Sequence, residues 1–508
     1  MHIKCISLII SKTYKRKILI TTKSEAFLLR FSFGRDDKTR TCDLAPPRRV
    51  RYQLRYIPIP YCLMISHLRC KGMTLFCILQ IFFVNLRTIY IKNAFKAQNM
   101  VISAPKGLKT EIILPASKSI SNRALVIRAL SGGNMPIENI SNCDDSRVVV
   151  EALLNMPRII DIKAAGTAMR FLTSMMATIP GEHVLTGTER MRNRPIGVLV
   201  DALRSIGANI QYEEKDGFPP LCIQGKKLCG GNLSLPGNIS SQYISSLLMI
   251  GPTLEHGLTL ELTGEVVSRP YIDMTLAIMR QFGAKAEWVS DKKIYVEPVP
   301  YTPTPCYIEN DWSAASYWYE MVALAEDANS NVILPGLFAN SLQGDSAVAK
   351  LFSALGVETR FKDNNVQLSK AKCTTAEFTC DLCEQPDLAQ TFAVTCCMLG
   401  IPFCLSGLQT LRIKETDRIA ALQKELGKLG YILNAGDDGI LSWNGEMATD
   451  IATAVSIDTY EDHRMAMAFA PVALKRRNIT INNPEVVSKS YPSFWDDITK
   501  AGFKLTKI

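Results

Sequence analysis

The sequence predicts an α/β fold built from a repeated unit, in which a helix ends at a glycine and a short strand follows. Three observations support this prediction. The pattern occurs five times, at Gly207, Gly283, Gly356, Gly430 and Gly502. The spacings are 76, 73, 74 and 72 residues. A glycine at the end of a helix is the usual left-handed cap, and a near-constant period indicates a repeated supersecondary unit.

The same period predicts a further unit at the start of the repeat region. Extrapolation backwards places it before about residue 150, where no matching glycine occurs. The stretch from Val148 to Ile162 is too short for a full unit. We therefore expect six units, with the first one abbreviated. The Pro- and Thr-rich stretch Pro298–Cys306 interrupts the chain near its midpoint and is the best candidate for a domain boundary.

Charge divides the chain into two parts. The net charge is +10, but residues 1–100 hold 19 of the 58 basic residues and only four acidic ones. The remainder is acidic on balance, which argues against nucleic-acid binding by the chain as a whole. The apolar run Thr74–Leu86 is too short to span a membrane, and no signal peptide is evident. We interpret residues 1–99 as a disordered or non-native extension, with translation starting at Met100. The alternative is a basic targeting arm.

Cofactor and metal motifs are missing from the sequence. It contains no G-x-G-x-x-G and no P-loop, so neither a dinucleotide nor an ATP site is indicated. Cys380 and Cys383 form a lone C-x-x-C without a second pair at zinc-finger spacing. The cysteines show no disulfide framework, which fits a reducing cytoplasm. We expect no metal.

Five of the seven residues in Arg412–Arg418 are charged. Apolar residues then recur at helical spacing, so 415–429 is predicted to be an amphipathic helix. Lys414 and Arg418 would share a face near its start, beside Glu415. Two cations and a carboxylate at a helix start suit an anionic substrate that also needs a proton moved. A solvated, charged helix start is the plainer alternative.

Ser- and Thr-rich polar patches precede four other apolar helical patterns, at residues 115–123, 164–170, 238–242 and 267–271. Each patch alone is explained by ordinary N-capping. Basic residues embedded in the set nevertheless favour a phosphorylated or polycarboxylate substrate. These are Lys118, Arg123, Arg170, Arg194, Lys414, Arg418 and Arg464.

Together these stretches resemble the 5-enolpyruvylshikimate-3-phosphate synthase family. The resemblance covers residues 100–508 and rests on LPASKSISNRAL, AAGTAMR, RMRNRPI, SSQ, SRPY, IKETDR, EDHRMAM and Lys489. It implies a two-domain inside-out α/β barrel, with three βαβαββ units in each domain and helix starts facing the cleft between them. The first domain would be 118–308, and the second 100–117 plus 309–508.

The resemblance also implies an activity. The family transfers the enolpyruvyl group of phosphoenolpyruvate to the 5-hydroxyl of shikimate 3-phosphate and releases phosphate, without a cofactor. We expect those two substrates, no nucleic-acid or membrane partner, a monomer and a cytoplasmic location. Asp387 corresponds to the base near the 5-hydroxyl, Lys414 contacts the same hydroxyl, and Glu415 is the candidate proton donor to the methylene carbon.

The binding residues are carried over by motif. Those implied for shikimate 3-phosphate are Lys118, Ser119, Arg123, Ser240, Ser241, Gln242 and Ser268, with Tyr271 against its ring. Those implied for phosphoenolpyruvate are Gly166, Arg194, Gln242, Arg418, Arg464 and Lys489. The chain departs from the family at Ala164, Phe171 and Thr410, where Asn, Pro and Asn are common, and in a shortened linker before Ala165.

Two other functions remain open at this stage. One is the sister reaction, in which UDP-N-acetylglucosamine accepts the enolpyruvyl group. We would expect a reactive cysteine in a first-domain loop for it, and the loop around Arg190–Arg194 has none. The other is a non-catalytic six-repeat scaffold that binds anions, in which Asp387 and Glu415 would be dispensable.

Overall fold

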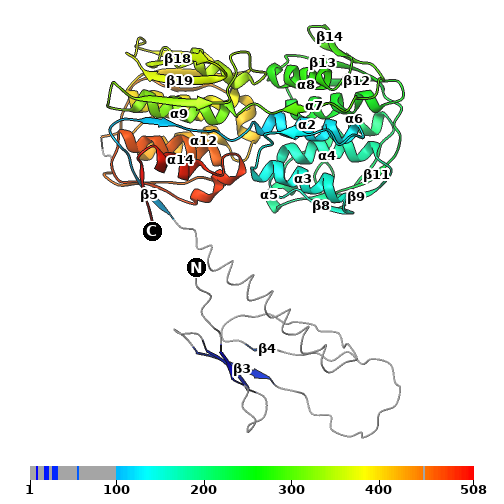
Figure 1. The fold of residues 1–508 in the computed structure, drawn as a ribbon, viewed down its shortest axis with the longest axis horizontal. Helices are drawn as coiled ribbons and strands as arrows, with labels where there is room; N and C mark the ends of the chain where they lie inside the picture. The colour runs from blue at the N-terminus through cyan, green and yellow to red at the C-terminus, as the bar shows by residue number, and fades with distance from the viewer. Residues whose placement is uncertain are drawn as a thin grey trace. The chain divides into compact units, whose positions relative to one another are not determined.

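The computed structural model describes residues 99–436, 438–449 and 452–508, together with four short strands nearer the start of the chain (Figure 1). The chain separates into two units, 1–96 and 97–508. In the first unit an antiparallel sheet is formed, in order, by β1 (Ser7–Ile9), β2 (Lys17–Thr21), β3 (Ala26–Phe31) and β4 (Leu54–Arg55). The prediction that 1–99 is a disordered or non-native extension otherwise lies outside the described residues.

The second unit contains βαβαββ repeats that each form one four-stranded sheet. Two complete repeats lie between residues 159 and 296. The first comprises β8 (Ile159–Asp161), α4 (Gly166–Thr178), β9 (Gly181–Thr186), α5 (Glu189–Arg192), α6 (Gly197–Ser205), β10 (Asn209–Tyr212) and β11 (Leu221–Gly225). The next comprises β12 (Gly231–Pro236), α7 (Ser241–Ile250), η1 (Gly251–Thr253), β13 (Leu258–Thr263), α8 (Arg269–Gln281), β14 (Ala286–Ser290) and β15 (Lys293–Val296). The first two strands of each repeat pair in parallel and the others antiparallel.

Three further repeats, each with its own four-stranded sheet, form the other half of this unit; short 3-10 helices are labelled η. One repeat comprises β6 (Lys109–Glu111), α9 (Trp312–Leu324), β17 (Asn331–Pro335), η2 (Gly344–Ala347), α10 (Val348–Leu351), β18 (Val357–Lys362) and β19 (Asn365–Lys370). Another contains β20 (Phe378–Asp381), η3 (Pro386–Leu388), α11 (Ala389–Leu399), β21 (Phe403–Ser406), η4 (Gln409–Ile413), α12 (Arg418–Lys428), β22 (Asn434–Ala435) and β23 (Leu441–Trp443). The last contains β24 (Val455–Ile457), α13 (His463–Phe469), η5 (Ala470–Leu474), β25 (Ile479–Ile481), η6 (Pro484–Lys489), α14 (Phe494–Lys500) and β26 (Lys504–Lys507), with β5 (Met100–Ser103) between β25 and β26.

The sixth sheet is reduced to two parallel strands. These are β7 (Ile137–Glu138) and β16 (Cys306–Tyr307), which accompany α2 (Lys118–Leu130) and α3 (Asp144–Asn155). The predicted α/β class is confirmed, and the short unit agrees with the expected abbreviation. Each of the five predicted glycines precedes the third strand of a four-stranded repeat and has a positive φ, between 81° and 101°. That conformation strains any residue with a Cβ, which explains the periodic glycine.

Two separate hydrophobic cores divide residues 97–508 into two lobes. The first lobe has its core residues between Ala116 and Ile308, and the second between Met100 and Leu114 and between Trp312 and Phe503. Helices occupy the middle of each lobe, with strands around them (Figure 1). The chain passes from one lobe to the other twice, near residue 116 and near residue 310. These two segments are hydrogen-bonded to each other: Ser117 N donates to Glu309 O at 2.8 Å, and Asp311 N donates to Pro115 O at 2.9 Å. The exact domain division stays a prediction, which the two cores support.

The charged stretch is placed differently from the prediction. Helix α12 begins at Arg418, not at residue 415, because the Asp417 side chain accepts a hydrogen bond from Ala420 N and caps it there. Lys414 and Glu415 therefore lie before the helix, in an irregular segment. The inference that Lys414 and Arg418 share a helix face was wrong. Both side chains nevertheless approach the same carboxylate, that of Asp387.

The second core contains a buried carboxyl, that of Glu320. Glu320 on α9 is fully buried, and neither of its carboxylate oxygens has a hydrogen-bond partner among the described residues. Burial raises the pKa of Glu320 well above its ordinary value. The folded protein therefore binds this proton more tightly than the unfolded chain, so stability falls as pH rises above the ordinary glutamate range.

Replacing Glu320 with glutamine is therefore expected to stabilise the protein. At pH 8 the Tm should rise by about 5 °C or more, and near pH 4.5 the gain should vanish. Thermal unfolding across this pH range checks the prediction. The matched control is Glu446→Gln, which changes an exposed carboxyl. An equal Tm gain at both pH values would show that charge burial is not the cause.

Candidate functional site

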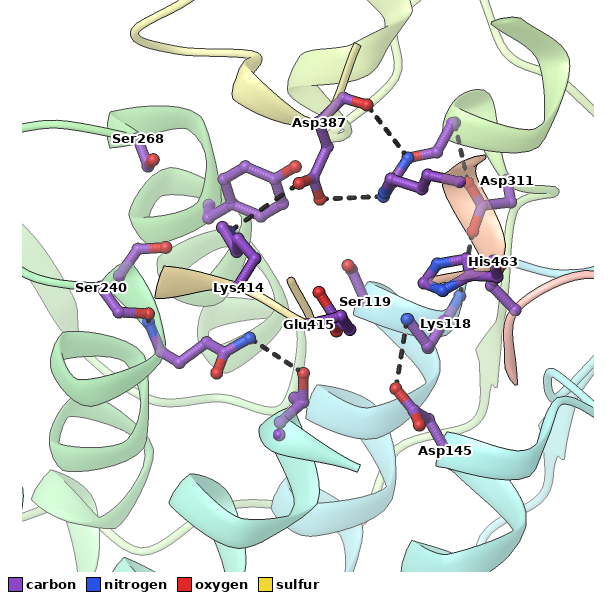
Figure 2. Close-up of a pocket in the computed structure, with 18 of the residues that line it drawn as sticks. Lys118, Ser119, Asp145, Ser240, Ser268, Asp311, Asp387, Lys414, Glu415 and His463 are labelled. Carbon is purple, nitrogen blue, oxygen red and sulfur yellow. Dashed lines mark hydrogen bonds and ion pairs between the residues drawn. The ribbon is translucent and has the colours of Figure 1, made fainter. Parts of the chain in front are cut away.

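A polar pocket lies between the two lobes (Figure 2). Every residue predicted to bind or react lines it, with the exception of Lys489. Those residues are Lys118, Ser119, Arg123, Gly166, Arg194, Ser240, Ser241, Gln242, Ser268, Tyr271, Asp387, Lys414, Glu415, Arg418 and Arg464. Lys489 contacts one of the lining residues, because its Nζ donates a hydrogen bond to the Glu415 carboxylate at 3.0 Å. The fold thus brings together residues that lie up to 371 positions apart in the sequence.

Helix starts form the first-lobe wall of the pocket. Ser119 lies in the first turn of α2, Gly166 opens α4, Ser241 opens α7, and Ser268 is the N-cap of α8. The first N–H groups of a helix have no partner within it, and the helix dipole places positive potential there. This wall is therefore suited to anionic groups, as the polar patches in the sequence predict.

Gly166 is required by close packing rather than by a special backbone angle. A Cβ at this position would lie 2.7 Å from Nη1 and 3.1 Å from Cζ of Arg194. The missing side chain lets the guanidinium lie directly against the start of α4. Arg194 is thereby held beside free helix N–H groups, which strengthens the anion-binding character of this corner.

Arg123 mainly makes hydrogen bonds between helices of the first lobe. Its Nε donates to Thr275 at 2.7 Å, its Nη1 donates to the Ser119 carbonyl at 2.9 Å, and its Nη2 donates to Ser245 at 3.1 Å and to the Tyr271 carbonyl at 3.3 Å. Burial lowers the pKa of Arg123 to about 10, so it remains charged at neutral pH. Most of its donors are used in joining α2 to α7 and α8.

The Asp387 carboxylate forms ion pairs with basic side chains on the second-lobe side of the pocket. Arg464 Nη2 lies 2.8 Å from one carboxylate oxygen, and Arg418 Nη1 lies 2.9 Å from the other, with Lys414 Nζ at 3.8 Å. Burial alone would raise the pKa of Asp387, but Arg464, Lys414 and Arg418 outweigh it and hold the pKa well below its usual range. The carboxylate is therefore ionised at neutral pH.

Glu415 is held in the same way. It accepts from Arg418 Nη2 at 2.9 Å and from Lys489 Nζ at 3.0 Å. Burial would raise the pKa of Glu415, but Lys489, Arg418 and Arg194 lower it well below its ordinary value. The two carboxylates thus neutralise the cations that an anionic ligand would contact. A ligand that takes over these cations must release the carboxylates from their ion pairs.

Arg418 joins the two carboxylates to the protein interior. Its side chain is 2% exposed, and its Nε donates at 2.7 Å to Asp462, which is fully buried. Asp462 also caps α13 by accepting from Arg464 N at 2.9 Å. The position of Arg418 is consequently fixed from both sides, by the pocket carboxylates and by the core.

Several lining residues were missed by the sequence analysis. Asp145 accepts from Lys118 Nζ at 3.2 Å, and Thr167 accepts from Gln242 Nε2 at 3.2 Å. Asp311 caps α9, a role that an Asp before an apolar helix could have indicated. The others are Ser313, Ala314, Tyr317, His463, Met467 and Ser490. Within the described residues no group of His, Cys, Asp and Glu side chains is arranged to hold a metal ion, and no helix is long and apolar enough to cross a bilayer.

Comparisons with known proteins agree on one family. A family described as EPSP synthase (3-phosphoshikimate 1-carboxyvinyltransferase) matches residues 102–158 and 154–498. The 3-phosphoshikimate 1-carboxyvinyltransferase of Bacteroides fragilis strain YCH46 is 55% identical over 403 residues, which cover 79% of this chain and 98% of that protein. The protein of the same name from Vibrio cholerae serotype O1 strain M66-2 is 37% identical over 415 residues, 76% and 95% of the two chains. A solved structure of EPSP synthase from Acinetobacter baumannii has a TM-score of 0.64 at 22% identity, covers 80% of this chain and all of that one, and shows the same fold.

Proposed function

This chain belongs to the EPSP synthase family, and we propose on that basis that it transfers the enolpyruvyl group of phosphoenolpyruvate to the 5-hydroxyl of shikimate 3-phosphate, with release of phosphate. The observation that carries the proposal is the pair of carboxylates, Asp387 and Glu415, held by one buried arginine in a cation-rich pocket. The reaction needs a base, an acid and anion-binding groups, and the pocket offers candidates for all three.

The chemistry uses these groups in two steps. The 5-hydroxyl oxygen bonds to C2 of phosphoenolpyruvate, its proton leaves towards Asp387, and a proton from Glu415 is added to C3. The resulting tetrahedral intermediate then loses phosphate from C2 and a proton from the new methyl group. The acid and base therefore exchange roles between addition and elimination. Lys414 lies near Asp387 and stabilises negative charge developing at the hydroxyl oxygen.

Substrate binding prepares both carboxylates for this work. Phosphoenolpyruvate brings a phosphate and a carboxylate, which pair with Arg194, Arg418 and Lys489. These cations lower the pKa of Glu415 in the free protein. Once substrate anions neutralise them, the pKa of Glu415 rises, and it can hold the proton that it donates. In the same way, a substrate anion that pairs with Arg464 weakens the effect of this cation on Asp387, so the pKa of Asp387 rises and Asp387 becomes a stronger base.

We further propose a cytoplasmic monomer. The first lobe supplies helix starts and the second supplies the charged cluster, so residues of a single chain line both sides of the pocket. The cysteines between Cys143 and Cys404 are free, which supports a reducing compartment. Measurement of the mass in solution tests the monomer, and localisation of a tagged chain tests the compartment.

Phosphate release by the full chain tests the proposed activity. Phosphate should appear when shikimate 3-phosphate and phosphoenolpyruvate are both present, and not with either alone. Asp387→Asn should abolish most of the release, whereas the exposed control Asp496→Asn should retain it. Release that requires UDP-N-acetylglucosamine as the acceptor would favour the sister reaction. A folded chain that binds both anions without any release would favour the scaffold.

Replacement of Gly166 by alanine tests the phosphoenolpyruvate corner. The added Cβ would displace the Arg194 guanidinium, because the two would lie 2.7 Å apart. We expect the KM for phosphoenolpyruvate to rise at least about tenfold, with a smaller effect on the KM for shikimate 3-phosphate. Gly427→Ala is the matched control, since its Cβ would meet nothing within 4 Å. Equal changes in both KM values would contradict the assignment of this corner.

A further inference from the structure

Asp345 is a buried carboxyl that lies behind the pocket wall rather than in it. It belongs to η2 in the second lobe and is 3% exposed. One of its oxygens accepts a hydrogen bond from the Tyr271 hydroxyl at 3.4 Å, and the other accepts a close hydrogen bond from Ser313 Oγ. Tyr271 lies on α8 of the first lobe and lines the pocket, whereas Asp345 does not. The hydrogen bond from Tyr271 therefore crosses from one lobe to the other.

The start of α8 meets the second lobe at two more points. Ser268 N donates to the Cys383 carbonyl at 3.2 Å. A Cβ at Gly344, the residue before Asp345, would lie 2.7 Å from Cβ of Pro270, so the two backbones are closely packed. Three contacts within one turn thus fix the first turn of α8, with its two predicted substrate residues Ser268 and Tyr271, against η2 and the loop that follows β20.

We propose that Asp345 is a positioning residue that docks the start of α8 onto the second lobe and so holds Tyr271 against the acceptor substrate. This proposal rests on the proposed function and adds a residue that the sequence motifs did not indicate. The hydrogen bond from Tyr271 can form only when the lobes are together, because its acceptor, Asp345, belongs to the other lobe. The contact couples lobe closure to the shape of the acceptor site.

Asp345 is linked through Ser313 to Arg464, which pairs with Asp387 in the pocket. Ser313 Oγ, which donates to Asp345, also accepts from Arg464 Nη2 at 3.5 Å. Burial and the nearby Asp387 raise the pKa of Asp345 to about 6, while Arg464 opposes the rise. Asp345 is therefore mostly ionised at pH 8, and a carboxylate is a stronger acceptor for the Tyr271 hydroxyl than a neutral group.

A double-mutant cycle tests this role. Steady-state kinetics at pH 8 should compare Asp345→Ala, Tyr271→Phe and the double variant, with Asp496→Ala as the exposed control. Each single variant is expected to raise the KM for shikimate 3-phosphate about tenfold, with a smaller change in the KM for phosphoenolpyruvate. The double variant should be no worse than the poorer single one, because both changes break the same contact. Asp345→Asn keeps an acceptor oxygen and should recover most of the lost affinity.

Several outcomes would overturn the proposal. They are an unchanged KM in Asp345→Ala, independent effects that multiply in the double variant, or no recovery in a folded Asp345→Asn protein. Thermal unfolding of each variant identifies a change that merely weakens the fold, since that would alter both KM values or lower the Tm of Asp345→Asn as well. The unsubstituted chain is measured in the same assay. Its failure to release phosphate with both substrates would count against the proposed function and not specifically against the role of Asp345.

Discussion

Replacing Glu415 with glutamine is expected to lower kcat by about 10³-fold, because the variant cannot donate a proton to C3 of phosphoenolpyruvate. Glutamine is nearly the same size, and its carbonyl oxygen can still accept from Arg418 or Lys489. The KM values should therefore change by less than about threefold. Steady-state phosphate release measures both quantities. Glu446→Gln, on the surface of the same lobe, is the matched control.

This result would separate catalysis from binding. An anion-binding scaffold would tolerate the loss of the Glu415 proton, whereas an enolpyruvyl transferase that follows the proposed route would not. Near-normal turnover in Glu415→Gln would remove this residue from the mechanism. A large rise in both KM values with little loss of kcat would instead assign Glu415 a purely structural role in holding Arg418 and Lys489.

Replacing Arg418 with methionine should cost both stability and activity. The change leaves the Asp462 carboxylate buried without its main partner and frees Asp387 and Glu415 from their shared cation. Loss of one partner from a buried ion pair typically destabilises a protein by about 3–5 kcal/mol. Denaturant unfolding should show a loss of this size, and phosphate release should fall below detection. Arg192→Met, which removes an exposed ion pair with Glu214, should change stability by less than about 1 kcal/mol.

A second substitution distinguishes the two consequences. Asparagine in place of Asp462 can still cap α13 but carries no charge, so Arg418→Met combined with Asp462→Asn should recover much of the lost stability. Activity should not return, because the proposed phosphoenolpyruvate site still lacks Arg418. Recovery of both properties would show that Arg418 acts only by supporting the fold.

The sequence predicted those features that depend on local chemistry. The five glycines marked the repeats because a left-handed helix cap is a local requirement that few other residues meet. The polar helix starts could be predicted from the sequence for the same reason, because N-capping is also a local requirement. The sharp start of α12 was misplaced by three residues, because the capping role of Asp417 competed with a helical pattern that extends further back. Local pattern alone does not decide between them.

Other features depend on contacts between distant segments. Glu320 lies in an apolar helix pattern, and nothing nearby in the sequence indicates that its carboxyl is buried with no hydrogen-bond partner in the described part of the chain. Asp345 lies in the short 3-10 helix η2 and acquires its proposed role only because α8 of the other lobe reaches it. The convergence of Asp387, Glu415 and Arg418 likewise requires the fold. For these predicted site residues the family resemblance supplied the grouping that spacing alone could not.

Deuterium incorporation tests the central claim, addition followed by elimination at an enol ether, most directly. With the full chain in D₂O, the proton added to C3 is a deuteron, and the new methyl group then loses one of its three hydrogens. The account predicts deuterium in the methylene group of the product by mass spectrometry, and the loss of this signal together with turnover in Glu415→Gln. Product that forms at a normal rate without any deuterium in its methylene group would contradict the account, because C3 would never have been protonated from a group that exchanges with solvent.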